Sequence, residues 1–337
     1  MKRVPKLAVL TLSAMLALSG CGMTSDPLPG TAGEDGQPVA VTTQDYAPAE
    51  VIKPKDGKKV KIGASFPLLD QFLQNVSNSI KARAEAAGAE VSVTSAEEKI
   101  EVQLNQIENF IASGVDALIV LPQDTATTAQ ITQKAKAANI PLVYVNRRPA
   151  DLPKGVPYVG SDSLVAGQLE MEQLAKLSNH QGNVAILQGD PTQEAAQQRT
   201  KGCEEIAAKY DMKIVFNQTG LWARDKGLAL TENLIQSGQQ VDVICANNDE
   251  MALGAINALE SAGMLDKVVV GGVDATGDAL AAMTAGKLEV TVFQDAKGQG
   301  QAGVDTAIKM INGDEVPDVI NVPYQLVTPE NMSQFQQ

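Results

Sequence analysis

From Val60 onward, short runs rich in Val and Ile alternate with longer stretches rich in Ala, Leu, Glu, Lys and Gln. The short runs have the length and composition of buried strands, and the longer ones have those of helices. A repeated strand–helix order predicts a parallel sheet covered by helices on both faces. The runs that we expect to be strands are 60–66, 90–93, 116–121, 141–146, 183–188, 213–216, 241–246, 267–273 and 289–293.

These strands are too many for one compact sheet of this kind. The fold class is therefore predicted to be α/β with two similar parallel sheets, and the connection at 155–163 marks the change from one to the other. Between most strands lie helix-length segments, such as 74–88 and 101–114. Both of these segments end in Gly, as helices often do.

The first residues of the chain have the pattern of an export signal. Lys2, Arg3 and Lys6 precede a short apolar run at 7–20, which is too short to be a spanning helix. The run ends in Leu-Ser-Gly before Cys21, which resembles the lipobox of bacterial lipoproteins. The resemblance implies that residues 1–20 are removed and that the thiol of Cys21 is acylated.

Residues 21–58 are rich in Pro, Gly, Thr, Asp and Ala and show little periodicity. This composition is typical of a flexible tether. We therefore expect the folded domain to begin near residue 60. Its contact with the membrane would be made through the lipid anchor alone.

The chain is acidic, with a formal net charge of −13 from 27 basic and 40 acidic residues. An acidic surface without a basic stripe repels phosphate backbones, so no nucleic-acid partner is expected. The one histidine, His180, lies in a polar run typical of a solvated turn. No CxxC or His–Cys cluster is present, so no structural zinc is expected. The glycine runs at 63–65 and 271–277 match neither the dinucleotide nor the P-loop pattern, and no cofactor is expected.

Cys203 and Cys245 both lie in apolar, periodic segments. Buried cysteines in such segments behave as small hydrophobes, which favours two inert thiols. Outside the cytoplasm the two could also form a disulfide. The sequence leaves both alternatives open, because pairing depends on the distance between them.

Polar side chains follow the predicted strands where each strand ends, which is where ligands bind in open parallel sheets. Arg147 and Arg199 supply fixed, charged N–H groups, and Asp274 supplies an acceptor. Hydroxyl groups both donate and accept hydrogen bonds, so this set of side chains suits a sugar-like polyol. The set contains no nucleophile–base pair, so we do not expect an enzyme. The strand-end residues are Ser65, Asn146, Arg147, Asn247, Asn248, Asp249, Asp274 and Gln294.

Trp222 is the single tryptophan of a chain in which aromatic residues make up only 4%. It begins a predicted helix at 222–238, so it can lie at a lobe edge that faces a cleft. A flat indole can cover the apolar C–H face of a sugar ring. Phe72, at the start of the first helix, is the expected second aromatic, although a phenylalanine there can also belong to the core.

Five segments resemble one known family in sequence, order and spacing: 143–148 (VYVNRR), 197–202 (QQRTKG), 222–227 (WARDKG), 246–259 (ANNDEMALGAINAL) and 270–280 (VGGVDATGDAL). They are similar to the ribose- and galactose-type periplasmic binding proteins, a sugar-binding family whose fold is shared with LacI repressors. The resemblance covers residues of about 60–327.

This resemblance implies two Rossmann-like parallel-sheet lobes joined by a hinge of three crossings, which close on the ligand. Lobe one would comprise 60–161 and 295–322, and lobe two 162–294 and 323–337. In the motif that begins at Asn248, Asp249 is expected to cap its helix. The implied ligand contacts are Ser65, Gln71, Phe72, Asn146, Arg147, Arg199, Trp222, Asn248, Asp274 and Gln294.

The sequence departs from the pattern of the ribose binders at two points. Asn146 stands where they have Asp, and Leu69, Gln71 and Phe72 replace an Asn and a pair of aromatics. Since an unpaired buried polar group costs about 1–3 kcal/mol, the ligand can be a hexose, another pentose or a cyclitol such as myo-inositol as well as ribose.

The function expected from these observations is that of a monomeric, lipid-anchored solute-binding protein. It would bind a monosaccharide or cyclitol by hinge closure and deliver it to the permease of an ABC importer. The alternative is a sensing component that docks on a chemoreceptor or sensor kinase. The protein is expected to be extracytoplasmic, in the periplasm or at the outer face of the cytoplasmic membrane.

Overall fold

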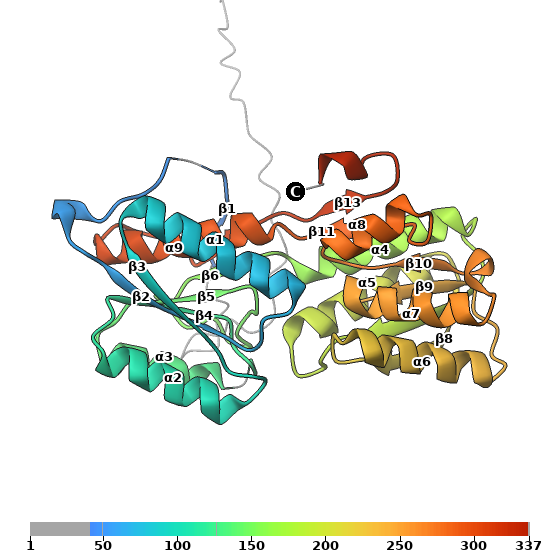
Figure 1. Ribbon diagram of the computed structural model, residues 1–337, viewed down its shortest axis with the longest axis horizontal. Coiled ribbons are helices and arrows are strands. Elements are labelled where there is room, and N and C mark those ends of the chain that lie inside the picture. Colours follow the sequence, from blue (N-terminus) through green and yellow to red (C-terminus); the bar gives the residue numbers. More distant parts are fainter. Residues whose placement is uncertain (1–40, 49, 126, 336–337) are drawn as a thin grey trace, which may run out of the picture.

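A computed structural model describes residues 41–48, 50–125 and 127–335 of the chain. The described residues form two α/β lobes that lie side by side (Figure 1). The predicted signal peptide, Cys21 and the first part of the predicted tether lie outside these residues.

Lobe one is built on a sheet that has seven strands within the described residues, all parallel. Helices α1 (Gln71–Ala87) and α9 (Ala296–Ile311) cover one face, and α2 (Ile100–Ala112) and α3 (Thr128–Ala137) cover the other. In spatial order the strands are β1 (Thr43–Asp45), β12 (Val319–Asn321), β6 (Tyr158–Gly160), β5 (Leu142–Val145), β4 (Ala117–Val120), β2 (Lys61–Phe66) and β3 (Glu90–Ser95).

Lobe two is built on four parallel strands in the order β10 (Val269–Gly271), β9 (Val243–Ala246), β7 (Asn183–Gln188) and β8 (Lys213–Thr219). Two antiparallel strands, β11 (Thr291–Phe293) and β13 (Gln325–Val327), extend this sheet, and isolated β-bridges join them to it. Its two faces are covered by different helices. These are α4 (Ser163–Leu177) and α5 (Glu194–Lys209) on one face, and α6 (Arg224–Gln236), α7 (Asp249–Ser261) and α8 (Gly277–Thr284) on the other.

The chain passes between the lobes three times within the described residues. The crossings lie between β6 and α4, between β11 and α9, and between β12 and β13. The prediction of an α/β fold with two parallel-sheet lobes and a three-crossing hinge is therefore confirmed. Each predicted strand is present: β7 has the predicted bounds, and the others differ from theirs by one to three residues at one or both ends.

The structure corrects the expectation that residues up to 58 form a flexible tether. The described residues 41–48 and 50–58, called segment 41–58 below, pack along lobe one, where β1 pairs with β12 and the amide of Tyr46 donates to the carbonyl of Asn321 at 2.7 Å. Tyr46, Val51 and Ile52 pack against the core. The edge of a sheet offers unpaired backbone groups, which this segment satisfies.

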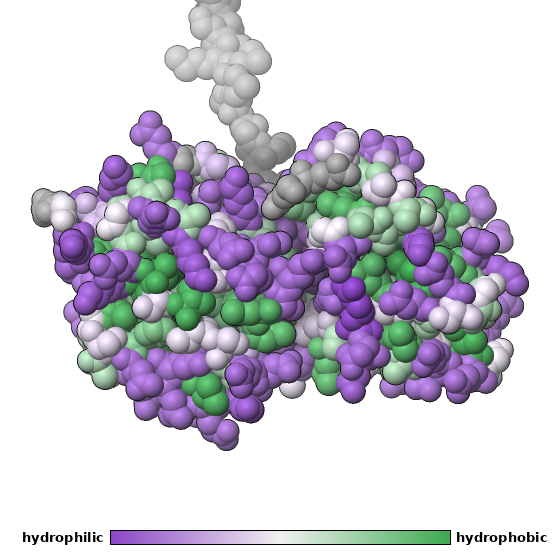
Figure 2. Space-filling view, viewed as in Figure 1, coloured by the Kyte–Doolittle hydropathy of each residue, from purple (hydrophilic) through white to green (hydrophobic). Residues whose placement is uncertain are grey.

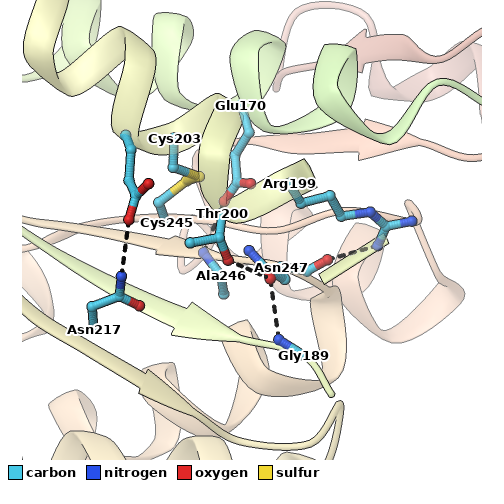
Figure 3. Close-up of a disulfide and its surroundings, with 10 residues drawn as sticks. Glu170, Gly189, Arg199, Thr200, Cys203, Asn217, Cys245, Ala246 and Asn247 are labelled. Carbon is cyan, nitrogen blue, oxygen red and sulfur yellow. Dashed lines mark hydrogen bonds between the residues drawn. A yellow bond between two sulfur atoms is a disulfide. The ribbon is translucent and has the colours of Figure 1, made fainter. Parts of the chain in front are cut away.

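Cys203 and Cys245 form a disulfide that joins α5 to β9, with an S–S distance of 2.05 Å. Both residues are fully buried in lobe two. Figure 3 shows the bond above Thr200 and Asn247 in the view, next to the carboxyl of Glu170. The question that the sequence left open is thus answered in favour of pairing.

The surface is largely hydrophilic. Figure 2 shows that hydrophilic side chains predominate where the two lobes meet on the face in view. In the described part of the chain, no helix combines the length and the apolar character needed to cross a membrane.

Candidate functional site

A cleft lies between the two lobes, and the space between its side chains amounts to about 490 Å³ with the open mouth included. Lobe one lines it with Asp70, Phe72, Leu73, Asn146 and Arg147. Lobe two lines it with Gln193, Ala195, Arg199, Trp222, Asn248 and Asp274. Side chains at or next to the three crossings complete it: Ser163, Gln294 and Tyr324.

All of the residues expected to contact the ligand line this cleft except Ser65 and Gln71. Ser65 is buried at the end of β2, where it accepts a hydrogen bond from Gln103 and donates one to Gln106. Gln71 is exposed at the start of α1, and its side chain hydrogen-bonds to Asp278 of lobe two. Gln71 therefore bridges the lobes outside the cleft.

Asn146 and Arg147 follow β5 and form the floor of the cleft on lobe one. Asn146 has φ of 64°, and its side-chain Nδ2 donates to Gln299 Oε1 at 3.0 Å, which leaves the side-chain Oδ1 for a ligand. Arg147 donates from Nη1 to the carbonyls of Pro122 and Gln123 at 3.3 and 3.4 Å. Burial lowers the pKa of Arg147 to about 10, so the guanidinium stays charged at neutral pH.

Arg199 is held from several sides in lobe two. Its Nη1 donates to the carbonyl of Asn247 at 2.7 Å, and its Nη2 donates to Gln294 Oε1 and to the Tyr324 hydroxyl at 2.8 Å each. Figure 3 shows the bond to Asn247. Its Nε is buried without a partner among the described residues. The guanidinium is thus oriented, and it keeps one donor for a ligand.

Asp274 provides an acceptor opposite these donors. It follows β10, it is 8% exposed, and its Oδ1 lies 3.9 Å from Arg199 Nη1. Burial raises the pKa of Asp274 well above its usual range, and the charge of Arg199 acts in the opposite direction. Asn146, Trp222 and Asp274 all have positive φ, an unusual backbone conformation that is often found at functional sites.

The indole of Trp222 lies at the edge of the cleft on lobe two. Its Nε1 donates to Gln193 Oε1 at 3.1 Å, and the guanidinium carbon of Arg199 lies 5.6 Å from its ring. Trp222 was expected to begin a helix, but α6 begins at Arg224 because Trp222 adopts φ of 68°. Phe72 lines the cleft from lobe one and also belongs to that lobe's core.

The expectation that Asp249 caps its helix is wrong. Asn248 caps α7, because its Oδ1 accepts from the amide of Met251 at 3.0 Å. Asp249 is fully buried and accepts from the Thr276 amide and the Thr291 hydroxyl at 2.8 and 2.7 Å. It ties α7 to neighbouring segments of lobe two, whereas Asn248 reaches the cleft.

Sequence reasoning missed several residues of the cleft, among them Asp70, Gln193 and Tyr324. Asp70 carries a readable signal only as a helix cap, since Asp is favoured immediately before a helix. Gln193 occupies the corresponding position, immediately before α5. Tyr324 lies in the third crossing, far along the chain from the other lining residues, and no local pattern distinguishes it.

The cleft offers donors and acceptors from both lobes. The guanidiniums of Arg147 and Arg199 donate, and the carboxyl of Asp274 and the side-chain Oδ1 of Asn146 accept. A hydroxylated ring can satisfy both kinds of group at once. Within the described ranges, the one group of three possible metal ligands is Glu170, Cys203 and Cys245, and its two sulfurs are joined in the disulfide.

The chain is similar to known proteins in sequence and in structure. The family model described as "Periplasmic binding protein domain" matches residues 62–315. A protein of Rhizobium meliloti named for rhizopine binding is 42% identical over 284 residues, which are 82% of this chain and 92% of that protein. The ribose import binding protein RbsB of Bacillus subtilis is 30% identical over 292 residues, covering 86% and 94%.

Solved structures agree. An ABC transporter solute-binding protein from Bacillus halodurans with bound myo-inositol has a TM-score of 0.79 and 42% identity, and the match covers 84% of this chain and 99% of that one.

Proposed function

The chain belongs to the type I periplasmic sugar-binding proteins, and from this premise we propose that it binds a cyclitol such as myo-inositol, or a monosaccharide, between its lobes for an ABC importer. The relatives that establish the family are binding proteins of transport systems. Like them, this chain is a sugar-binding protein and not an enzyme. Its location is extracytoplasmic, as the family implies.

The observation that carries this proposal is the set of polar donors and acceptors that faces the ligand space from both lobes. Arg147 faces the ligand space from lobe one, and Arg199 with Asp274 faces it from lobe two. Hydrogen bonds between charged groups and neutral hydroxyls are worth about 1.5–3 kcal/mol each. The indole of Trp222 adds a flat apolar surface suited to the C–H face of a ring.

Two comparisons favour a cyclitol as the first ligand to test. The Bacillus halodurans protein was solved with myo-inositol, and so was the Caulobacter protein named for binding it, which is 26% identical to this chain. A monosaccharide stays the alternative, because ribose import binding proteins are also among the relatives. The eight predicted contacts that line the cleft are retained as proposed ligand-binding residues. Ser65 and Gln71 are proposed to support the site from outside it.

Ligand binding is proposed to bring together lobe one (60–161 and 295–322) and lobe two (162–294 and 323–337). Direct contacts between the lobes support closure, since the Thr125 hydroxyl of lobe one donates to the Thr192 carbonyl of lobe two at 2.9 Å. Gln71 and Asp278 make a second contact of this kind. A ligand that bridges both lobes binds the closed form more tightly than the open form, and its binding therefore stabilises the closed form.

Acylation of Cys21 and docking on an importer permease complete the proposal. The lipobox-like sequence before Cys21 supports the first, and family membership supports the second. Metabolic labelling with a fatty-acid analogue tests the anchor: the wild-type protein should be labelled, and a Cys21→Ala variant should not.

A thermal-shift screen of residues 22–337 against cyclitols, pentoses and hexoses tests the binding function. A ligand that binds only the native state raises the unfolding midpoint in proportion to the logarithm of its concentration. We expect myo-inositol to give the largest shift. No shift with any cyclitol or monosaccharide at millimolar concentration would contradict the proposal.

A further inference from the structure

The disulfide joins the two segments of lobe two that carry Arg199 and Asn247. Cys203 follows Arg199 by four residues on α5, so both side chains extend from the same face of the helix. Cys245 lies in β9, two residues before Asn247. Arg199 Nη1 donates to the Asn247 carbonyl at 2.7 Å. The covalent bond and this hydrogen bond therefore connect the same helix to the same strand end, about one helical turn apart.

Asn247 is held at this strand end by further hydrogen bonds. Its Oδ1 accepts from the Thr200 hydroxyl of α5 at 3.0 Å and from the Gly189 amide at 3.1 Å. Figure 3 shows these bonds together with the disulfide and the guanidinium of Arg199. Asn248 is the next residue, and it caps α7 and lines the cleft. A shift of α5 relative to β9 would therefore move residues that line the cleft on lobe two.

On another side, α5 lies at backbone contact with α4. A Cβ atom on Gly167 of α4 would lie 2.0 Å from the carbonyl oxygen of Arg199, and one on Gly202 would lie 2.6 Å from that of Leu164. This close contact prevents α5 from moving toward α4, but it does not hold α5 on the sheet. The disulfide fixes the distance between α5 and β9, because it is covalent whereas the contacts beside it are hydrogen bonds.

The surroundings of the disulfide include a buried polar group. Glu170 of α4 is fully buried, and its Oε1 accepts from the Ala246 amide at 2.9 Å. Its Oε2 has no hydrogen-bond partner among the described residues. A buried polar atom without a partner is costly, and water that entered between α5 and β9 would hydrogen-bond to it. Local opening is thus favoured at this place, and the disulfide opposes it.

Building on the proposed function, we propose that Cys203 and Cys245 are positioning residues of the ligand site. Both are fully buried and neither lines the cleft. Their bond holds α5 on β9, and it thereby keeps Arg199, Asn247 and Asn248 in the arrangement that receives the ligand. Ligand affinity therefore depends on the oxidation state of the pair. Reduction adds two electrons and two protons, breaks the S–S bond and leaves two thiols.

The same chain with and without the bond provides the first test. Residues 22–337 contain no other cysteine. Unfolding with a phosphine reductant and refolding without oxygen gives the dithiol, and a sample treated without reductant is the control. We expect the dithiol to bind myo-inositol about tenfold more weakly in calorimetric titration, since a less preorganised site binds less tightly. Reoxidation should restore the affinity of the control.

A matched pair of variants separates positioning from the stability of lobe two. Cys203→Ala/Cys245→Ala removes the bond, and Leu259→Ala removes packing from α7 on the opposite face of the sheet, where Leu259 is fully buried. Titrations are made well below both unfolding midpoints. We expect the cysteine variant to lose about tenfold in affinity and Leu259→Ala to bind as the wild type does.

The fluorescence of Trp222 gives a readout that lower stability alone does not move. The guanidinium carbon of Arg199 lies 5.6 Å from the indole ring, so a displaced Arg199 alters the environment of the indole. The emission of the apo dithiol and of the apo cysteine variant should therefore differ from that of the oxidised wild type. Apo Leu259→Ala should keep the wild-type emission.

Each outcome bears on a different conclusion. If the oxidised protein, the dithiol and the cysteine variant bind myo-inositol equally well, this inference is wrong and the proposed function stands. An equal loss of affinity in Leu259→Ala would also overturn it, because general stability would then account for the effect. If the oxidised wild type binds no cyclitol and no monosaccharide, the proposed function itself is wrong, and this inference with it.

Discussion

The indole of Trp222 lies directly against the backbone of Gly189. A Cβ atom on Gly189 would lie 2.2 Å from two ring carbons of Trp222, a distance that no side chain tolerates. Gly189 follows β7, and its amide donates to Asn247 Oδ1 at 3.1 Å (Figure 3). The absence of a side chain at Gly189 therefore sets how far the indole withdraws from the ligand space.

Gly189→Ala is predicted to weaken ligand binding without removing a single polar contact. The added methyl group must push the indole into the cleft, and overpacking of this kind costs about 1–3 kcal/mol. We expect affinity to fall at least tenfold in calorimetric titration. The fluorescence of Trp222, the sole tryptophan of the chain, should also change in the apo protein.

A double-mutant cycle provides the control for this prediction. If the effect is transmitted through the indole, Gly189→Ala should cost little further affinity in a Trp222→Ala background. Additive losses would show that Gly189 acts by another route. Unchanged fluorescence on ligand binding in the wild type, together with normal binding by Trp222→Ala, would contradict the stacking role.

The two cleft arginines are predicted to differ in what their loss does to the apo protein. Arg199 holds Asn247, Gln294 and Tyr324 through short hydrogen bonds, so Arg199→Ala leaves several buried groups unpaired. We expect a loss of about 3–5 kcal/mol of unfolding free energy. Arg147 makes only long bonds to two carbonyls, and Arg147→Ala should cost about 1 kcal/mol.

Both alanine variants should lose ligand binding, which calorimetric titration measures. Denaturant unfolding of the apo proteins should show a larger loss of unfolding free energy for Arg199→Ala than for Arg147→Ala. Equal apo stabilities would show that the hydrogen bonds of Arg199 contribute little to the fold. Retained binding by Arg147→Ala would remove this residue from the proposed site.

Much of the fold is predictable because long buried strands and helices are encoded locally. The run 183–188 of Val, Ile and Leu yields β7 with the predicted bounds. Strands β1, β6, β12 and β13 were missed, because each has three residues and, unlike the equally short β10 and β11, none lies in a longer run that was predicted as a strand. Pairing with distant neighbours determines them, as when β1 joins β12 across more than 270 positions.

The site is predictable to the extent that it lies at strand ends. Asn146 and Asp274 were found in that way, since the ends of parallel strands converge on one edge. Asp70 and Tyr324 were not, because a helix cap and a hinge crossing reach the cleft only through the tertiary fold. The sequence also predicts the same role for Arg147 and Arg199, and only their hydrogen bonds in the folded protein distinguish the two.

Removing the disulfide is predicted to destabilise lobe two. The bond closes a loop over a sequence separation of 42 residues, and the chain-entropy estimate for such a loop is about 4 kcal/mol. The Cys203→Ala/Cys245→Ala variant should show this loss in denaturant unfolding. A difference below about 1 kcal/mol would mean that the surrounding packing holds α5 on β9 without the bond.

Tyr46 links the docked segment 41–58 to a buried ion pair. Its hydroxyl donates to Asp305 Oδ2 at 3.5 Å, and Arg83 donates to the same carboxylate from Nε and Nη2 at 2.8 and 2.6 Å. Burial raises the pKa of Tyr46 to about 12, and the carboxylate of Asp305 adds to the effect. The folded state thus favours the neutral phenol.

The sign of the resulting pH dependence follows from this pKa. Because it exceeds the value near 10 of an unfolded tyrosine, the contribution of Tyr46 to stability is complete below pH 10 and is lost as the pH rises through 12. Denaturant unfolding of the wild type and of Tyr46→Phe should therefore give free-energy curves that converge between pH 10 and 12. Other buried tyrosines titrate equally in both proteins and cancel in the difference. Parallel curves over this range would show that folding does not raise the pKa of Tyr46, and would contradict its burial beside Asp305.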